Sequence, residues 1–337
     1  MNSYYRPILQ SGPARPAKSE ALAGGWTWFS HAELLERGRA PVVVPLEDIP
    51  LTRVECWIKP LPALCGLDPA QPQVMGILNT TPDSFSDGGQ HFSVDAALKG
   101  ARRMKGAAIL DIGGESTRPG ATVVPIEEEI NRTVPVIEAL RTAGHAEVLS
   151  IDTRKAAVAD AALAAGADIV NDVSGLTFDA DLAPVCAERE VPVCIMHAQG
   201  DPATMQDAPA YDDVLLDVYD FLEARISQAV ASGIPRARII ADPGIGFGKT
   251  LEHNLTLLAR LSLFHSLQVP LLLGASRKRF IGTIGGAEAP EQRMPGSVSV
   301  ALAALKHGTQ IVRVHDVPET LQAIALWRAV VAGQTHG

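Results

Sequence analysis

The sequence has few cysteines and no C-x-x-C pair among them. Only four occur in 337 residues. Structural zinc sites and redox-active dithiols usually need such pairs, so neither is expected here. We interpret the four as buried free thiols: Cys56, Cys65, Cys186 and Cys194.

An excess of positive charge is also missing. The chain has 29 Lys and Arg against 38 Asp and Glu, which gives a formal net charge of −9. A nucleic-acid surface normally shows a basic stripe, so we expect no nucleic-acid partner. Small anionic substrates remain compatible, because a local cluster can oppose the overall sign.

Long apolar runs are absent as well. No run approaches the roughly 18 residues of a membrane span. The start, MNSYYRPILQSGPARPAKSEA, lacks the basic-then-apolar order of a secretion signal. We therefore expect no membrane partner and a cytoplasmic location.

The stretch ADPGIGFGKT, residues 241–250, resembles a nucleotide-binding loop but lacks one essential glycine. Such a loop needs Gly, four residues, then Gly-Lys-Thr, so that successive N–H groups surround the phosphates. The first glycine position holds Pro243, which has no N–H to donate. Asp242 and Lys249 therefore need another explanation than ATP or GTP binding.

Short apolar runs alternate with segments of helical spacing from Gln73 onward. The eight runs are QVMGILN, AAILDIG, EVLSID, DIVNDV, VPVCIMH, ARIIADPG, VPLLLGAS and TQIVRVHD. Strands this uniformly apolar are typical of a parallel sheet covered by helices. Eight strand–helix units in residues 73–333 predict an α/β fold, a (β/α)8 TIM barrel. A doubly wound open sheet is the alternative, although no G-x-G-x-x-G motif supports its dinucleotide-binding version.

Residues 1–72 do not follow this alternation and form an N-terminal extension of unknown role. The segment SHAELLERG predicts a helix that Ser30 could cap. The segment APVVVPLEDIP predicts one short strand. The extension could plug the bottom of the barrel, extend a dimer interface or stay partly mobile, and the sequence does not choose among these.

Polar side chains stand where each of the eight runs ends. One such residue would mean little, because loops are polar in any fold. In a barrel, however, the carboxyl ends of the strands form one mouth, which holds the active site. An unpaired charge beside an apolar run is costly, so we expect these groups to face a polar ligand or one another. They are Asn79, Asp111 with Glu115, Asp152, Asn171 with Asp172, His197, Asp242, Ser276 with Lys278, and Arg313 with His315.

Four of these side chains suit a flat heterocycle. Asp152 and Asp242 supply acceptors, Asn171 an amide and Lys278 a cation. This mixture can bind a ring that carries several N–H and C=O groups along its edge.

Three others suit a phosphate or pyrophosphate. Arg313 and His315 alternate on one strand and therefore point the same way, and Asn79 ends the neighbouring first strand. An arginine, a histidine and an amide oxygen can hold a phosphate group together with a hard cation. The first two strand–helix connections are long and rich in Gly, Ser, Thr and Pro, as in loops that cover a substrate.

Seven segments stand in order at the expected strand ends: ILNTTPDSFSDGG, DIGGESTRPGA, VNDVSG, IMHAQGDPATMQ, DPGIGFGKTLEHN, GASRKRFIG and RVHDVPET. Together they resemble the dihydropteroate synthases of folate biosynthesis, a family of pterin-binding barrels, over residues 73–330. In that family the aspartate of the DPGxGFGK segment contacts the pterin, so the resemblance gives Asp242 a role. The usual member begins close to its first strand, so residues 1–72 depart from the family.

The resemblance implies several groups of site residues. The pterin contacts would be Asp152, Asn171, Met196, Asp242 and Lys278. The diphosphate contacts would be Asn79, Arg118, Arg313 and His315, with Asn79 also a ligand of Mg²⁺. The aminobenzoate pocket and covering loops would be formed by Phe85, Asp87, Thr117, Pro119, Phe247, Ser276 and Arg277. The groups with catalytic roles would be Asp152, Asp242, Lys278, Arg118, Arg313 and His315.

The implied activity is that of a transferase. It condenses 6-hydroxymethyl-7,8-dihydropterin diphosphate with 4-aminobenzoate to give 7,8-dihydropteroate and pyrophosphate, with Mg²⁺ as cofactor. Members are commonly homodimers and targets of sulfonamides. We expect the leaving group to depart ahead of attack, with Asp152 and Asp242 stabilising a delocalised pterin cation, and assign no single general base.

Two other functions are compatible with a pterin-binding barrel. One is a pterin-dependent methyltransferase with a corrinoid partner, which would have no use for the Ser-Thr-Arg-Pro and Arg-x-His segments found here. The other is a paralogue that binds pterins without turnover, which would typically lack a charged residue at the mouth.

Overall fold

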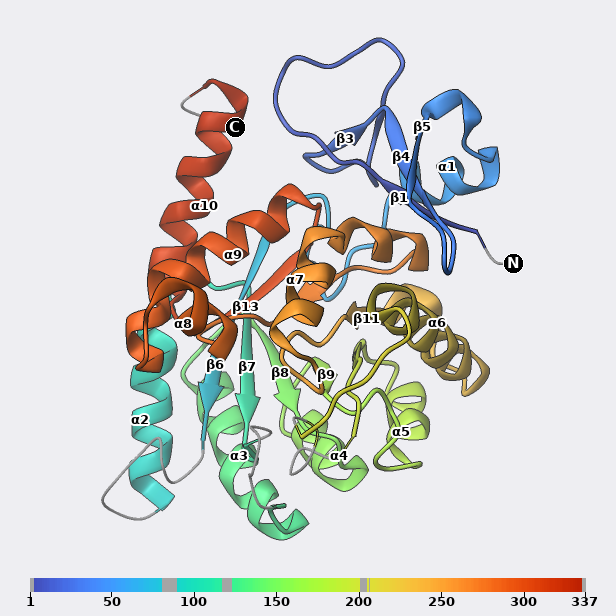
Figure 1. Ribbon diagram of the computed structural model, residues 1–337. Helices are drawn as coiled ribbons and strands as arrows, with labels where there is room; N and C mark the ends of the chain where they lie inside the picture. The colour runs from blue at the N-terminus through green and yellow to red at the C-terminus, as the bar shows by residue number, and fades with distance from the viewer. Residues whose placement is uncertain (1–2, 81–89, 117–122, 201–204, 206, 335–337) are drawn as a thin grey trace.

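The chain forms a parallel barrel with the N-terminal extension at one end (Figure 1). The structure, a computed structural model, describes residues 3–80, 90–116, 123–200, 205 and 207–334, without the side chains of residues 90–93. None of the helices in these ranges is long and apolar enough to cross a lipid bilayer.

Eight parallel strands form the barrel, in the order β11-β10-β9-β8-β7-β6-β13-β12. They are β6 (Gln73–Asn79), β7 (Ile109–Gly113), β8 (Val148–Asp152), β9 (Ile169–Asp172), β10 (Val193–Met196), β11 (Ile239–Asp242), β12 (Leu272–Leu273) and β13 (Ile311–Val314). A parallel bridge between Ala241 and Leu271 joins the two end strands, and the Ala241 N–H donates to the Pro270 carbonyl at 2.9 Å. The expected (β/α)8 barrel is confirmed, and the open-sheet alternative is wrong.

Helices follow the strands and cover the outside of the barrel. They are α2 (Gln90–Arg103), α3 (Ile126–Thr142), α4 (Ala156–Ala164), α5 (Leu182–Glu188), α6 (Val214–Ala231), α7 (Leu251–Ala259), α8 (Arg279–Gly285), α9 (Met294–Lys306) and α10 (Val317–Ala332). In the part of the barrel that the structure describes, three short 3-10 helices accompany them: η3 (Arg236–Arg238), η4 (Leu261–Leu267) and η5 (Pro290–Arg293).

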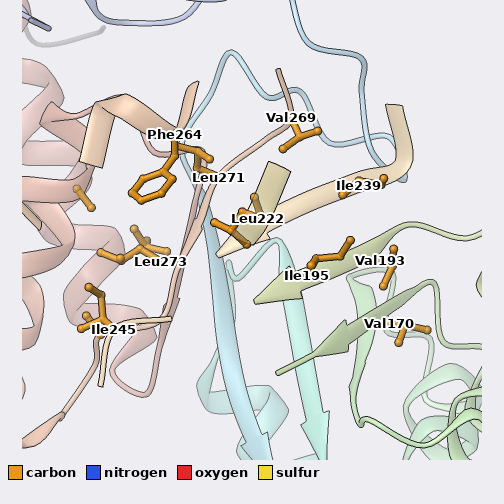
Figure 2. Close-up of a cluster of buried hydrophobic side chains, with 14 of the residues drawn as sticks. Val170, Val193, Ile195, Leu222, Ile239, Ile245, Phe264, Val269, Leu271 and Leu273 are labelled. Carbon is orange, nitrogen blue, oxygen red and sulfur yellow. The ribbon is translucent and has the colours of Figure 1, made fainter. Parts of the chain in front are cut away.

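The main core lies between the strands and these helices (Figure 2). Ile195 of β10 and Ile239 of β11 are fully buried there, together with Leu222 of α6. Phe264 of η4 packs in the same cluster as Leu271, beside the closing bridge. Burying a side chain of this size contributes about 1.5–3 kcal/mol, so the core holds the strand ends in a fixed arrangement.

The extension has its own small sheets. An antiparallel sheet joins β1 (Tyr4–Pro7), β4 (His31–Leu35) and β5 (Val42–Pro45), and β2 (Glu20–Ala21) pairs with β3 (Trp28–Phe29). η1 (Leu46–Asp48) and α1 (Leu51–Ile58) follow. The expected strand in APVVVPLEDIP is confirmed as β5.

The helix expected in SHAELLERG is wrong, because His31–Leu35 forms the central strand of the three. β4 pairs with β1 on one side and with β5 on the other. Its Glu33 is buried between Arg6 of β1, 2.6 Å away, and Arg260 of the barrel, 3.2 Å away. These pairings outweigh the helix propensity of the Ala, Glu and Leu residues in the segment, because tertiary contacts override intrinsic propensity.

Polar contacts also attach the extension to the barrel. The Tyr4 hydroxyl donates to Asp220 of α6 at 2.9 Å, and the Trp57 indole donates to Ser266 of η4 at 2.9 Å. The Trp26 indole donates to the Leu305 carbonyl of α9 at 2.8 Å. Three parts of the extension are thus bonded to three different barrel elements.

The end of the extension closes the bottom of the barrel. Leu64 is 6% exposed and packs among residues at the amino ends of the strands, including Met75, Ile109 and Ile240, with Leu67 beside it. Figure 1 shows the extension beside this end, whereas the arrowheads of β6, β7 and β8 point the other way. Of the three roles left open by the sequence, the plug is the one that these contacts support.

All four cysteines are free thiols. Cys186 and Cys194 are buried, as expected. The expectation of burial is wrong for Cys65, which is exposed, and for Cys56, which is half-buried, because both belong to the extension and its linker rather than to a barrel strand.

Candidate active site

Strand register aligns three of the predicted residues across the mouth. Asn79 of β6 pairs with Gly113, Gly113 pairs with Asp152 of β8, and Asp152 pairs with Asn171 of β9. Parallel strands that end at the same level place these side chains side by side. The strand ends therefore converge as the sequence predicted.

Met196 and Asp242 are aligned in the same way on β10 and β11. Both side chains are buried, Asp242 with 5% exposure. Main-chain N–H of Gly244 donates to Asp242 Oδ1 at 2.7 Å. Burial raises the pKa of Asp242, and the charges of Lys278, Lys249 and Arg313 oppose this rise.

Arg313 of β13 connects two carboxylates across the mouth. Its Nε lies 2.6 Å from Asp111 Oδ2, and its Nη2 lies 2.6 Å from Asp152 Oδ2. The same Asp111 oxygen accepts a hydrogen bond from Asn171 Nδ2 at 3.1 Å. Asp111 thereby fixes the orientation of both the guanidinium group and the amide, a role that sequence analysis did not assign to it.

Two carboxylate oxygens in this group are buried without a hydrogen-bond partner among the described residues: Asp111 Oδ1 and Asp152 Oδ1. Burial raises the pKa of Asp152 to about 7, Arg313 opposes the rise, and Asp111 adds to it. A buried acceptor without a partner is costly. Asp152 is therefore suited to a ligand that donates N–H groups, or to a proton when no ligand is bound.

Lys278 lies at the mouth opposite these groups. Its Nζ donates to the Ile245 carbonyl and lies 4.4 Å from the centre of the Phe247 ring. Burial lowers the pKa of Lys278 to about 8; Asp242 opposes this shift, and Arg313 adds to it. The structure thus brings Phe247, Lys278 and Asp242 to one side of the mouth.

Gly274, just after β12, has no side chain and leaves space between Asp242 and Arg313. A Cβ atom at this position would lie 3.6 Å from Asp242 Oδ2 and 3.9 Å from Arg313 Cδ. Ser276 follows it, and its hydroxyl lies 3.0 Å from His315 Nδ1. Arg277 extends toward α10, where its Nε donates to Asp316 Oδ2 at 3.0 Å.

Among the described residues, the amide oxygen of Asn79 is a donor of the kind that Mg²⁺ accepts. Within the described ranges no group of three or more His, Cys, Asp or Glu side chains could hold a metal ion. Mg²⁺ often has only one or two protein ligands and keeps water and phosphate oxygens for the rest. A Cβ atom at Gly113 would lie 3.8 Å from both Asn79 Oδ1 and Asp152 Oδ2, so its absence leaves space beside the Asn79 amide oxygen.

Five predicted residues lie outside the described residues: Phe85, Asp87, Thr117, Arg118 and Pro119. Their roles, like the ligand contacts of the described site residues, stay predictions.

Three other residues at strand ends face neighbouring protein groups. Asp172 Oδ1 accepts from the Ser174 N–H of its own loop at 2.7 Å, and His197 Nδ1 lies 2.8 Å from Lys249 Nζ. Glu115 pairs with two basic residues that sequence analysis did not single out. Its partners are Arg154 at 2.9 Å and Lys155 at 2.6 Å.

These two basic residues follow β8 directly and are buried. Lys155 also pairs with Glu129 and donates to the Val124 carbonyl at 2.8 Å. The sequence contained a signal for this ion-pair cluster. Arg154 and Lys155 follow β8, Glu115 follows the neighbouring β7, and residues after neighbouring parallel strands lie at the same edge of the sheet.

Comparisons with known proteins agree with this geometry. The pattern of the family described as pterin binding enzyme matches residues 75–315. Dihydropteroate synthase of Escherichia coli K12 is 47% identical over 274 residues, which cover 80% of this chain and 96% of that protein.

Solved structures give the same result. Dihydropteroate synthase of Yersinia pestis, in a complex with a sulfonamide drug, is 48% identical with a TM-score of 0.74, and the match covers 78% of this chain and 96% of that one. Dihydropteroate synthase of Xanthomonas albilineans with 4-aminobenzoic acid is 50% identical with a TM-score of 0.74, and the match covers 78% and 94%. The chain therefore belongs to the pterin-binding enzyme family and, within it, to the dihydropteroate synthases.

Proposed function

We propose that this protein condenses 6-hydroxymethyl-7,8-dihydropterin diphosphate with 4-aminobenzoate to form 7,8-dihydropteroate and pyrophosphate in folate biosynthesis. The observation that carries the proposal is the meeting of Asp152, Asn171, Asp242 and Lys278 at one mouth, in a chain of the synthase family. The enzyme is a transferase, and the family makes it a sulfonamide target.

The pterin ring would be bound along its polar edge. Asp152 and Asp242 offer carboxylate oxygens to ring N–H groups, and Lys278 offers N–H to a ring acceptor. Asn171, whose Nδ2 donates to Asp111, would offer the remaining polar atoms of its amide group to the ligand. N–H groups donated to Asp152 Oδ1 would satisfy a buried oxygen that has no described protein partner.

The reaction breaks the bond between the pterin methylene carbon and the diphosphate oxygen, and it forms a bond from that carbon to the aniline nitrogen. Both electrons of the broken bond leave with pyrophosphate, and the nitrogen loses one proton to solvent. Asp152 and Asp242 are placed to stabilise positive charge that spreads over the ring as the leaving group departs. A weak nucleophile then needs no base of its own.

We further propose that Asn79, Arg118, Arg313 and His315 bind the diphosphate, with Asn79 as ligand of Mg²⁺. The bound ion would supply charge neutralisation for the departing pyrophosphate. The space beside Gly113 and the amide oxygen of Asn79 support this assignment. Phe247, Ser276 and Arg277, with Phe85, Asp87, Thr117 and Pro119 from the first two loops, would form the aminobenzoate side.

A homodimer and a cytoplasmic location are also proposals. The exposed apolar side chains of α10 support the first, since Leu326 is 65% exposed and Val330 is 71% exposed. Exposed apolar residues on one helix are a common feature of subunit interfaces.

The decisive experiment measures pyrophosphate release by the purified protein with Mg²⁺ and the pterin diphosphate. We expect rapid release when 4-aminobenzoate is present and little without it. Equal, slow release under both conditions would point to the non-catalytic paralogue. Transfer of a methyl group from methyltetrahydrofolate would point to the methyltransferase, an alternative that the synthase relatives disfavour.

A further inference from the structure

The lysine of the apparent nucleotide loop is buried in a cradle of main-chain carbonyls. Lys249 is 3% exposed. Its Nζ donates to the carbonyls of Gly244 at 2.9 Å, Phe247 at 3.0 Å and His197 at 3.4 Å, and it lies 2.8 Å from His197 Nδ1. The hydrogen-bond partners of this ammonium group among the described residues are thus all neutral.

Glycines allow the loop to turn its carbonyls inward. Gly244 and Gly248 have φ of 69° and 60°, in the left-handed region. A Cβ atom would lie 1.9 Å from the His197 carbonyl oxygen at Gly244, and 2.4 Å from the Gln199 carbonyl oxygen at Gly248. A phosphate loop surrounds an anion with N–H groups, whereas this loop surrounds a cation with C=O groups.

Burial lowers the pKa of both members of this pair. Burial lowers the pKa of Lys249 well below its usual value, and nearby Lys278 adds to the shift. Burial lowers the pKa of His197 to about 2, and the charge of Lys249 adds to it. His197 is therefore neutral, and its Nδ1 is free to accept a hydrogen bond from the lysine.

The outer side of the same loop contacts the site. Lys249 binds the carbonyls of Gly244 and Phe247, and the Ile245 carbonyl lies between them in the sequence. This carbonyl accepts a hydrogen bond from Lys278 Nζ. The Phe247 ring lies 4.4 Å from that Nζ, and the Gly244 N–H donates to Asp242. One buried lysine thus holds the loop from inside, while a second lysine binds the ligand side of the loop.

We propose that Lys249 is a positioning residue for this enzyme: its Nζ, bonded to the main-chain carbonyls of the loop, holds the loop in shape and thereby places Ile245 and Phe247 against Lys278. The proposal deepens the proposed function and rests on it, because Lys278 is assigned to the pterin. Lys249 itself does not touch the substrate.

The test is a double-mutant cycle on kcat/KM for the pterin diphosphate. Lys249→Met keeps the length and apolar contacts of the side chain and removes its charge and donors. We expect it to lower kcat/KM at least about tenfold, and Lys278→Met to lower it about 100-fold. If Lys249 acts through Lys278, the double variant will lie within about threefold of Lys278→Met alone.

Additive losses, or a Lys249→Met enzyme as active as the wild type, would overturn the proposal. Lys99→Met is the matched control, because Lys99 is exposed on α2. If the wild-type enzyme turns over in the same assay, the proposed function holds, and additive losses would then reject only the role of Lys249. If the wild-type enzyme does not turn over, the proposed function itself fails.

A second pair of variants covers the case in which Lys249→Met does not fold. His197→Gln keeps a side-chain acceptor for the lysine, and His197→Leu removes it. We expect His197→Gln to retain most of kcat/KM and His197→Leu to lose at least about fivefold, with thermal unfolding recorded for both. Equal activities of the two variants would show that the hydrogen bond between Lys249 and His197 does not help to position the loop.

Discussion

Arg313 Nη2 and Asp152 Oδ2 are 2.6 Å apart, and this contact joins the last strand of the barrel to its third. The same guanidinium group reaches Asp111 through Nε. The planar guanidinium group of an arginine can bind two carboxylates at once, whereas the ammonium group of a lysine cannot keep both contacts in the same geometry.

Arg313→Lys should therefore lower kcat/KM by about 100-fold while the barrel stays folded. Steady-state kinetics with pyrophosphate detection would measure the loss. Arg102→Lys, on the exposed face of α2, is the matched control. Activity within twofold of wild type would show that the two-carboxylate contact has no part in the reaction.

The acid side of the pH profile should follow Asp152. Its pKa in the folded chain is about 7, set by burial and by the facing charges of Arg313, Asp111, Glu129 and Asp172. Because the ionised form binds the pterin cation, kcat/KM should rise as pH increases through about 7. In Asp152→Asn this limb should disappear along with most of the turnover.

The same shift affects stability. Asp152 holds its proton more tightly in the folded chain than in the unfolded chain, where the pKa is 3.8. The folded state binds more protons between these two values, so its stability should fall as pH rises from about 4 to about 7. Urea unfolding across this range should show a weaker decline for Asp152→Asn, and an equal decline would assign the effect to other groups.

The basic side of the profile should follow Lys278. Its pKa is lowered to about 8, so it loses its proton in the mildly alkaline range. Since only the protonated amine can donate to the pterin as a cation, kcat/KM should fall as pH rises through about 8. Lys278→Arg should move this limb to higher pH, because a guanidinium group keeps its charge.

The plug at the bottom of the barrel should matter for stability and not for chemistry. Leu64→Ala should lower the free energy of unfolding by about 2–5 kcal/mol and leave kcat/KM unchanged. Leu51→Ala is the control, because Leu51 is 71% exposed. Equal unfolding midpoints for the two variants would mean that Leu64 does not seal the barrel.

The proposed dimer can be tested on α10. Replacing Leu326 and Val330 together by glutamate should convert a dimer into a monomer in analytical ultracentrifugation, since two charges in an apolar interface are unfavourable. Ile284→Glu, at a residue 61% exposed on α8, should leave the mass unchanged. A wild-type monomer would refute the proposal directly.

The barrel was predictable because its signal repeats. Each strand is a short apolar run, and the polar residue at its end marks the mouth, so Asn79, Asp152 and Asp242 could be placed together from order alone. The extension was less predictable. His31–Leu35 has helix-forming residues, and only its pairing with β1 on one side and with the following strand β5 on the other makes it a strand.

The roles of single side chains within the site were the hardest to predict. The sequence shows that Asp111 and Lys249 are polar residues near strand ends, but not which neighbour each one meets. Asp111 proves to orient Arg313 and Asn171, because its side chain on β7 reaches side chains from β13 and β9. The position of Lys249 depends on glycine conformations that place carbonyls inside a loop, which no spacing rule reveals.

The seal formed by Leu64 and Leu67 separates the two ends of the molecule. The contacts at this closed end hold the strands together independently of the side chains at the mouth. Substitutions at the mouth therefore leave the contacts of Leu64 and Leu67 intact, because these contacts lie at the amino ends of the strands.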